Sequence, residues 1–136
     1  MSRSAPDTSI AIAALLADHP AYEASAEALA TCDTTIAHVA AETYSVLTRL
    51  PPPHRADATT VAKALKERLP RAHVTLRARD HAGAPGRLAA SGISGGATYD
   101  GLIALTAIEH DLELVSRDRR AARTYRALGA RFQLLV

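Results

Sequence analysis

One segment, residues 100–116, constrains the fold of this chain more than any other. From Leu102 to Ile108 apolar side chains lie around nearly the whole circumference of the predicted helix, so that helix is expected to be buried on most sides. A short strand-like run follows at residues 111–116, and the polar sequence Arg117–Arg120 begins where that run ends. A buried helix leading directly into a strand predicts the interior of an α/β fold.

The rest of the chain also alternates strand-like and helix-like segments. A short strand and a helix are expected within residues 3–16. Further strands are predicted at residues 33–36, 72–76, 113–116 and 131–136, and further helices at 21–31, 37–50, 56–69, 79–91 and 119–128. This alternation predicts a parallel sheet with helices covering both of its faces.

Length and composition indicate one domain spanning residues 1–136. A single cysteine, Cys32, excludes an internal disulfide and fits a reducing compartment. The longest uncharged apolar run, residues 9–17, is far shorter than the ~20 residues that a membrane span requires. No secretory signal is apparent. The sequence therefore predicts a soluble cytoplasmic protein that has no membrane partner.

Charge is divided unevenly between the two parts of the chain. The net charge is only +2, yet residues 1–48 hold one base against six acids, and residues 49–136 hold fifteen bases against eight acids. Such a division suits a protein that keeps acids for a site and spreads arginines where a polyanion lies. On charge alone, a solvated surface is the favoured explanation of this pattern.

Four acids occupy positions that are unusual for a carboxylate. Asp7 follows the first predicted strand, Glu42 lies on the apolar face of its helix, Asp100 shares a strip with buried residues, and Asp118 follows the fourth strand. Helix capping or a satisfied core carboxylate would explain each one alone. If all four converge, their repulsion requires a positive partner, and all-oxygen ligands select Mg²⁺ or Mn²⁺.

The motifs around these acids resemble the PIN-domain ribonucleases. They are Asp-Thr-Ser at residues 7–9, the helical Glu42, Tyr-Asp-Gly-Leu-Ile-Ala at 99–104 and Ser-Arg-Asp-Arg at 116–119. Chain length and the Gly-Gly-Ala-Thr-Tyr-Asp approach resemble in particular the VapC toxins of bacterial toxin–antitoxin pairs. The resemblance implies a three-layer α/β/α fold with a five-stranded parallel sheet. It also implies a Mg²⁺-dependent endoribonuclease, a homodimer and a VapB-like antitoxin partner.

The same resemblance assigns roles to residues. Asp7 and Asp100 would hold the metal most directly, and Asp118 and Glu42 would complete its coordination. Thr8, Ser9 and Ser116 would support the carboxylates by hydrogen bonds. RNA would bind in a groove beside this site, and the arginines that line the groove would be Arg117, Arg119 and Arg123.

The first strand departs from the family pattern. Arg3-Ser4-Ala5-Pro6 is polar and places a proline directly before Asp7. Because proline has no N–H to give to a ladder, strand one is predicted to be short or distorted and Asp7 slightly displaced.

Other kinds of site and module have less support in the sequence. The six histidines show no paired ligand spacing, Gly92–Gly96 lacks the lysine of a nucleotide loop, and no Gly-x-Ser-x-Gly elbow is present. A receiver-like signalling module needs a lysine near its fifth strand, but the only lysines are Lys63 and Lys66. A catalytically idle PIN-like interaction or RNA-binding module stays open, because Pro6 could spoil the site.

Overall fold

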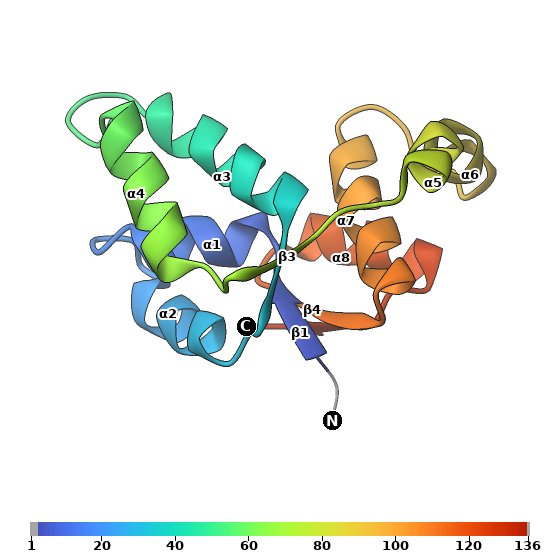
Figure 1. Ribbon diagram of the computed structural model, residues 1–136, viewed down its shortest axis with the longest axis horizontal. Coiled ribbons are helices and arrows are strands. Elements are labelled where there is room, and N and C mark those ends of the chain that lie inside the picture. The colour runs from blue at the N-terminus through green and yellow to red at the C-terminus, as the bar shows by residue number, and fades with distance from the viewer. Residues whose placement is uncertain (1–2, 136) are drawn as a thin grey trace.

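The computed structural model describes residues 3–135, along which helices and strands alternate. Helices α1–α4 lie on one side of the strands and α5–α8 on the other (Figure 1). In chain order the elements are β1 Arg3–Pro6, α1 Thr8–Leu15, α2 Tyr22–Ala30, β2 Thr34–Ile36, α3 Ala37–Thr48, α4 Ala58–Arg68, β3 Ala72–Val74, α5 Ala78–Ala82, α6 Ala84–Ala90, α7 Ala97–Glu109, β4 Leu112–Ser116, α8 Arg119–Leu128 and β5 Phe132–Leu134.

The strands of the described chain form two parallel sheets rather than the single five-stranded sheet that the sequence predicted. One sheet has the order β1-β4-β5, and the other pairs β2 with β3. β2 lies beside β1, where the Asp33 N–H donates to the Ser4 carbonyl at 3.1 Å. The Asp33 carboxylate accepts from the Ser4 N–H at 3.3 Å, and Pro6 has no N–H to donate. Asp33 and Pro6 therefore explain why no ladder joins the two sheets: the Asp33 side chain occupies the Ser4 N–H, and Pro6 offers no N–H to β2.

Strand β1 is as short as the sequence predicted, but it keeps its register with β4. Pro6 is opposite Val115, and the Asp7 N–H donates to the Val115 carbonyl at 2.9 Å. The predicted displacement of Asp7 is therefore not seen on the β4 side of the strand.

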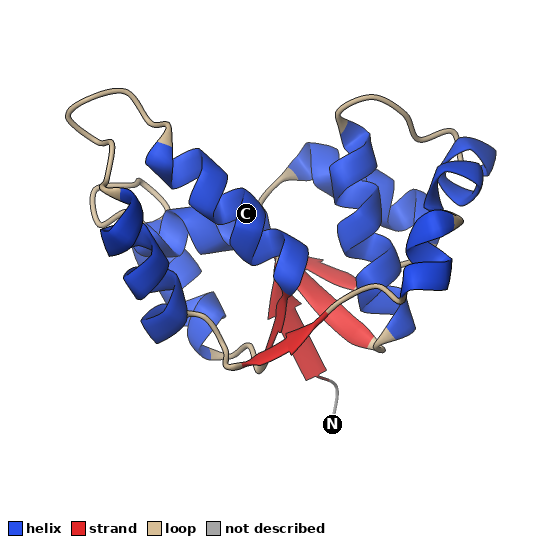
Figure 2. Cartoon of the chain, turned by 45° about the horizontal axis from the view of Figure 1, so that its top comes forward, coloured by secondary structure: helices blue, strands red, loops and turns tan. Residues whose placement is uncertain are grey.

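The order of the strands defines a switch point between β1 and β4. From β1 the chain passes to β2 and β3 on one side, and it then returns to β4 on the other side (Figure 2). In α/β sheets the crevice outside the carboxyl ends of two such strands is the usual ligand site. Asp7 follows β1 and Asp118 lies two residues after β4, so both acids begin at this crevice.

Helix α7 is buried, as its apolar sequence predicted. Ile103, Ala104 and Ala107 are fully buried in the main core, together with Leu114 of β4. The sequence motif suggested that Asp100 opens this helix, but α7 begins three residues earlier, at Ala97, so Asp100 lies within its first turn. None of the helices in residues 3–135 combines the length and apolar character that crossing a bilayer requires.

The segment predicted as one helix at residues 79–91 is two short helices, α5 and α6, separated at Gly83. α6 packs very closely on α7. A Cβ atom at Gly101 would lie 2.5 Å from Cδ2 of Leu88, which is buried. A glycine at position 101 thus allows this close approach beside Asp100.

Candidate active site

Asp7 is a buried carboxylate held by groups from α1, α8 and β4. It caps α1, and its Oδ1 accepts from the Ile10 N–H at 3.3 Å and from Ser9 Oγ at 2.6 Å. Its Oδ2 accepts from the Tyr125 hydroxyl of α8 at 2.7 Å. Burial raises the pKa of Asp7, while hydrogen bonds from Ser116, Ser9 and Tyr125 oppose that rise. The capping role and the site role therefore coexist in this one side chain.

Two serines connect Asp7 to Asp118. The hydroxyls of Ser9 and Ser116 lie 3.5 Å apart, and Ser116 Oγ accepts from the Asp118 N–H at 3.0 Å. Asp118 in turn caps α8 by accepting from the Arg120 N–H at 2.8 Å. The acids that follow β1 and β4 thus belong to one hydrogen-bond network.

Glu42 reaches the same region from the opposite helix. It is half-buried on α3, and its Oε1 accepts a hydrogen bond from Thr8 Oγ1 in the first turn of α1. Glu42 is therefore fixed beside the residue that follows Asp7, which agrees with its predicted position on the inward face of its helix.

The charges of the three other acids act on the carboxyl of Asp100. Burial raises the pKa of Asp100 to about 6, and the negative charges of Asp118, Glu42 and Asp7 contribute to the rise. Asp100 therefore lies within electrostatic range of the other three predicted acids, although the four come from positions as far apart as residues 7 and 118. At neutral pH the region carries repulsion that a bound cation would relieve.

The chemistry of these donors fits a hard divalent cation, since carboxylate and hydroxyl oxygens are what Mg²⁺ and Mn²⁺ prefer. Within residues 3–135, however, no three His, Cys, Asp or Glu side chains form a group that could hold an ion as they now lie. Hydrogen bonds explain the present orientations, because Asp7, Glu42 and Asp118 all accept bonds from their own helices or a neighbouring one. Metal binding would thus require some of these carboxylates to rotate.

The three predicted arginines lie next to Asp118 in the chain, one directly before it and two in the first half of α8. Arg117, Arg119 and Arg123 are exposed, and none forms a salt bridge within the part of the chain that the structure describes. The Arg117 backbone N–H donates to Ser9 Oγ at 3.0 Å, so this residue is anchored to the serine network. The side chains are available to a polyanion.

Sequence analysis missed Tyr125, which is fully buried against Asp7. Burial raises the pKa of its hydroxyl, as do the charge of Asp7 and the hydrogen bond to it, so the hydroxyl stays a donor. A signal was present: Tyr125 lies on the same buried face of α8 as Ala121 and Ala122, and a buried tyrosine hydroxyl needs a partner.

We expect Tyr125→Phe to preserve the fold and to weaken the site. The change removes the hydroxyl that donates to Asp7 Oδ2, which lets this carboxylate turn. Loss of an outer hydrogen-bond partner typically costs about 10- to 100-fold in metal affinity or activity. Calorimetric titration with Mn²⁺ measures the change, and Tyr22→Phe on α2 is the matched control. Equal affinities for wild type and Tyr125→Phe would contradict this role.

The fold and the site define a parallel α/β protein that gathers acids at its strand switch point, and known proteins share that plan. A model of the PIN domain matches residues 5–127. Ribonuclease VapC40 of Mycobacterium tuberculosis is 41% identical over 132 residues, which cover 97% of this chain and 98% of that protein. Ribonuclease VapC27 of the same organism is 44% identical over 126 residues, or 92% and 91% of the two chains. The chain belongs to the PIN-domain family, among the VapC-type ribonuclease toxins.

Solved structures agree with this fold. The crystal structure of VapBC2 from Rickettsia felis, bound to a DNA fragment from its promoter, contains a chain that superposes with a TM-score of 0.68 at 20% identity. The DNA-bound VapBC of Salmonella typhimurium gives 0.68 at 21% identity. In both cases 98% of each chain is covered.

Proposed function

We propose that this protein is a Mg²⁺-dependent endoribonuclease and the toxin of a VapBC-type pair. The observation that carries the proposal is the gathering of Asp7, Glu42, Asp100 and Asp118 near the β1–β4 switch point. There the charges of the other three acids raise the free energy of ionising Asp100. Two relatives above 40% identity that span nearly the whole chain are named ribonucleases, which supports RNA as the substrate.

Each acid has a part in the proposed reaction. A divalent metal bound here supplies an acidified water and positive charge beside the scissile phosphate. Asp7 and Asp100 hold the metal, while Glu42 and Asp118 complete its coordination or orient water. Ser9, Ser116 and Thr8 fix the carboxylates through the hydrogen bonds described above. No side chain acts as a covalent nucleophile.

The exposed arginines position the RNA backbone. Arg117 and Arg119 flank Asp118, and Arg123 lies one helical turn beyond Arg119. Guanidinium groups match phosphate oxygens in charge and geometry, so these three side chains fit an RNA strand laid across the acids.

A partner that covers this site would have to carry positive charge. The solved structures with this fold include VapBC complexes, which supports a VapB-like antitoxin as that partner. We propose that a lysine or arginine of the antitoxin enters among the four carboxylates in place of the metal, and that the toxin itself forms a homodimer. Cellular RNA as the substrate places this activity in the cytoplasm.

The catalytically idle alternative rests on Pro6 distorting the site. The in-register pairing of β1 with β4 is evidence against such a distortion on the β4 side, because it holds the Asp7 backbone against Val115. A module that binds RNA without cutting it is distinguished from the enzyme by the assay that follows.

The proposed activity predicts new RNA ends only when metal is present. Purified protein incubated with total cellular RNA and Mg²⁺ should generate discrete new 5′ ends, and EDTA should suppress them. A preparation of Asp100→Asn purified in parallel controls for contaminating nucleases. RNA that is retained by the protein but stays intact with both Mg²⁺ and Mn²⁺ would favour the idle module.

A further inference from the structure

Two aromatic rings join the helices that carry Glu42 and Asp100. His38 lies in the first turn of α3, and Tyr99 in the first turn of α7. Their rings are parallel within 5°, with centroids 5.8 Å apart. We call this pair the Tyr99–His38 stack. Because Tyr99 directly precedes Asp100, and His38 is one helical turn before Glu42, the stack borders the four acids.

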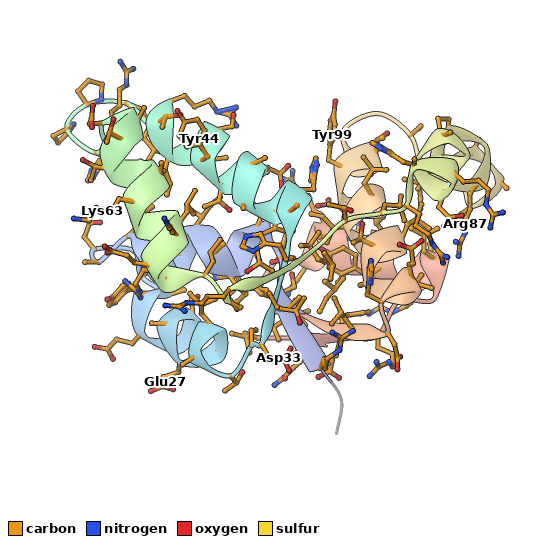
Figure 3. All side chains as sticks on the ribbon, in the orientation of Figure 1. Glu27, Asp33, Tyr44, Lys63, Arg87 and Tyr99 are labelled. Carbon is orange, nitrogen blue, oxygen red and sulfur yellow. The ribbon has the colours of Figure 1, made fainter. Side chains whose placement is uncertain are left out.

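Tyr99 presents an aromatic surface to solvent. Its side chain projects from the start of α7 (Figure 3), and it is 53% exposed. The 5.8 Å spacing describes an offset pair, in which part of each ring is left uncovered by the other. The other large hydrophobic residue exposed within residues 3–135 is Tyr44, which is 39% exposed on α3. Tyr44 is two residues from Glu42 and therefore points to a different side of that helix.

His38 occupies a position that does not favour stability. Its Nε2 atom is buried and has no hydrogen-bond partner among residues 3–135. A buried nitrogen without a partner lowers stability, so the stack with Tyr99 is the contact that accounts for this ring. No sequence pattern distinguishes His38 from the five other histidines.

A cavity adjoins the stack on the His38 side. Its volume is about 200 Å³, and Ile36, Leu102, Thr75 and His81 line it together with His38.

We propose that the Tyr99–His38 stack is the platform on which one unstacked base of single-stranded RNA lies while the neighbouring phosphodiester is cut. This inference rests on the proposed RNA cleavage, and it adds where the base sits. Proteins recognise single-stranded RNA by stacking splayed bases on aromatic side chains, and such a surface tolerates any base. A base on Tyr99 places the attached phosphate next to Asp100, since the two residues are adjacent in the chain. RNA held in a duplex offers no such base, so cleavage falls in unpaired segments.

The stack is tested by fluorescence in a protein that cannot cut the probe. The probe is a short single-stranded oligoribonucleotide in which 2-aminopurine replaces one base, with the replaced position moved along the strand. Bound to Asp100→Asn protein, one probe position should be strongly quenched by stacking. The quenching should persist in Asp100→Asn with Tyr99→Phe, which keeps a ring, and disappear with Tyr99→Leu. Tyr44→Leu, which removes an exposed tyrosine on another side of α3, should leave the quenching unchanged.

Cleavage by otherwise wild-type protein gives the second readout. Tyr99→Leu should lower kcat/KM by roughly 5- to 150-fold, the range expected from losing one base stack. Tyr99→Phe should restore most of it. The melting temperature of Tyr99→Phe should match that of the wild type, because this variant keeps the ring that stacks on His38. Tyr99→Leu should stay folded at the assay temperature, because the Tyr99 side chain is 53% exposed.

The outcomes separate this inference from the proposed function. RNA cleavage that is equally fast in wild type and Tyr99→Leu, with quenching unchanged, overturns the stack but leaves the ribonuclease in place. Quenching that depends on Tyr99 in a protein that cuts no RNA supports the stack and overturns the ribonuclease. A Tyr99→Leu variant that keeps both RNA readouts and loses only antitoxin binding would make this surface a protein contact, and the proposal would fail.

Discussion

Replacing Asp100 with asparagine is expected to abolish RNA cleavage and, without divalent metal, to raise the free energy of unfolding at neutral pH. Asparagine keeps the shape of the side chain but removes the charge that Asp118, Glu42 and Asp7 oppose. It also removes a ligand for the proposed metal. Cleavage of total RNA measures the first effect, and urea denaturation in EDTA measures the second. Near wild-type cleavage by Asp100→Asn would show that this carboxylate is not part of the site.

The gain in stability from Asp100→Asn should depend on pH. The carboxyl titrates near 3.8 in an unfolded chain and at about 6 in the folded protein. Below about pH 3 it is mostly protonated in both states, so the substitution should change little. As pH rises between the two pKa values, the unfolded chain releases its proton before the folded one does, and the wild type loses stability relative to the variant. The difference should be complete above about pH 7.

Metal should reverse this relation. A cation that binds only the folded protein stabilises it by mass action, so Mg²⁺ should raise the melting temperature of the wild type and not that of Asp100→Asn. Asp18→Asn is the control, because the Asp18 side chain is 71% exposed. It should cleave RNA and respond to Mg²⁺ like the wild type.

Two variants of Asp7 should separate the structural role of its carboxylate from its catalytic role. Asp7→Ala removes the cap of α1 and leaves the hydroxyls of Tyr125 and Ser9 without their acceptor. Losing a cap and leaving a buried hydroxyl unpaired should together cost roughly 2–4 kcal/mol of folding free energy. Asp7→Asn keeps an oxygen for the Ile10 N–H, so it should fold much better while cleaving no RNA.

Urea denaturation of the two Asp7 variants at matched pH measures the structural part, and the RNA cleavage assay measures the catalytic part. An alanine variant as stable as the wild type would contradict the capping role. An asparagine variant that still cuts RNA would instead remove Asp7 from the metal site.

The acids could be found from the sequence because each is marked by its place in one local element. Asp7 and Asp118 follow strands and begin helices, and Glu42 and Asp100 lie on strips shared with buried residues. Periodicity and capping patterns act over a few residues, and these four signals lie within that range.

Contacts between distant elements could not be found in this way. Tyr125 meets Asp7 across 118 residues, and the Tyr99–His38 stack joins two helices. Neither pairing leaves a periodic signal in the sequence. The division of the sheet has a similar origin, because it depends on Asp33 bonding to Ser4 across the β1–β2 boundary. The metal, the RNA contacts of the arginines and the oligomeric state stay predictions.

The hydrogen bond from the Asp7 N–H to Val115 has a consequence for the order in which the protein is made. Asp7 leaves the ribosome well before its neighbours Val115, Ser116 and Tyr125. A nascent chain that ends before β4 contains Asp7, Glu42 and Asp100 but lacks the strand that aligns the first of them. The four acids can therefore take up this arrangement only after β4 and α8 have also been synthesised.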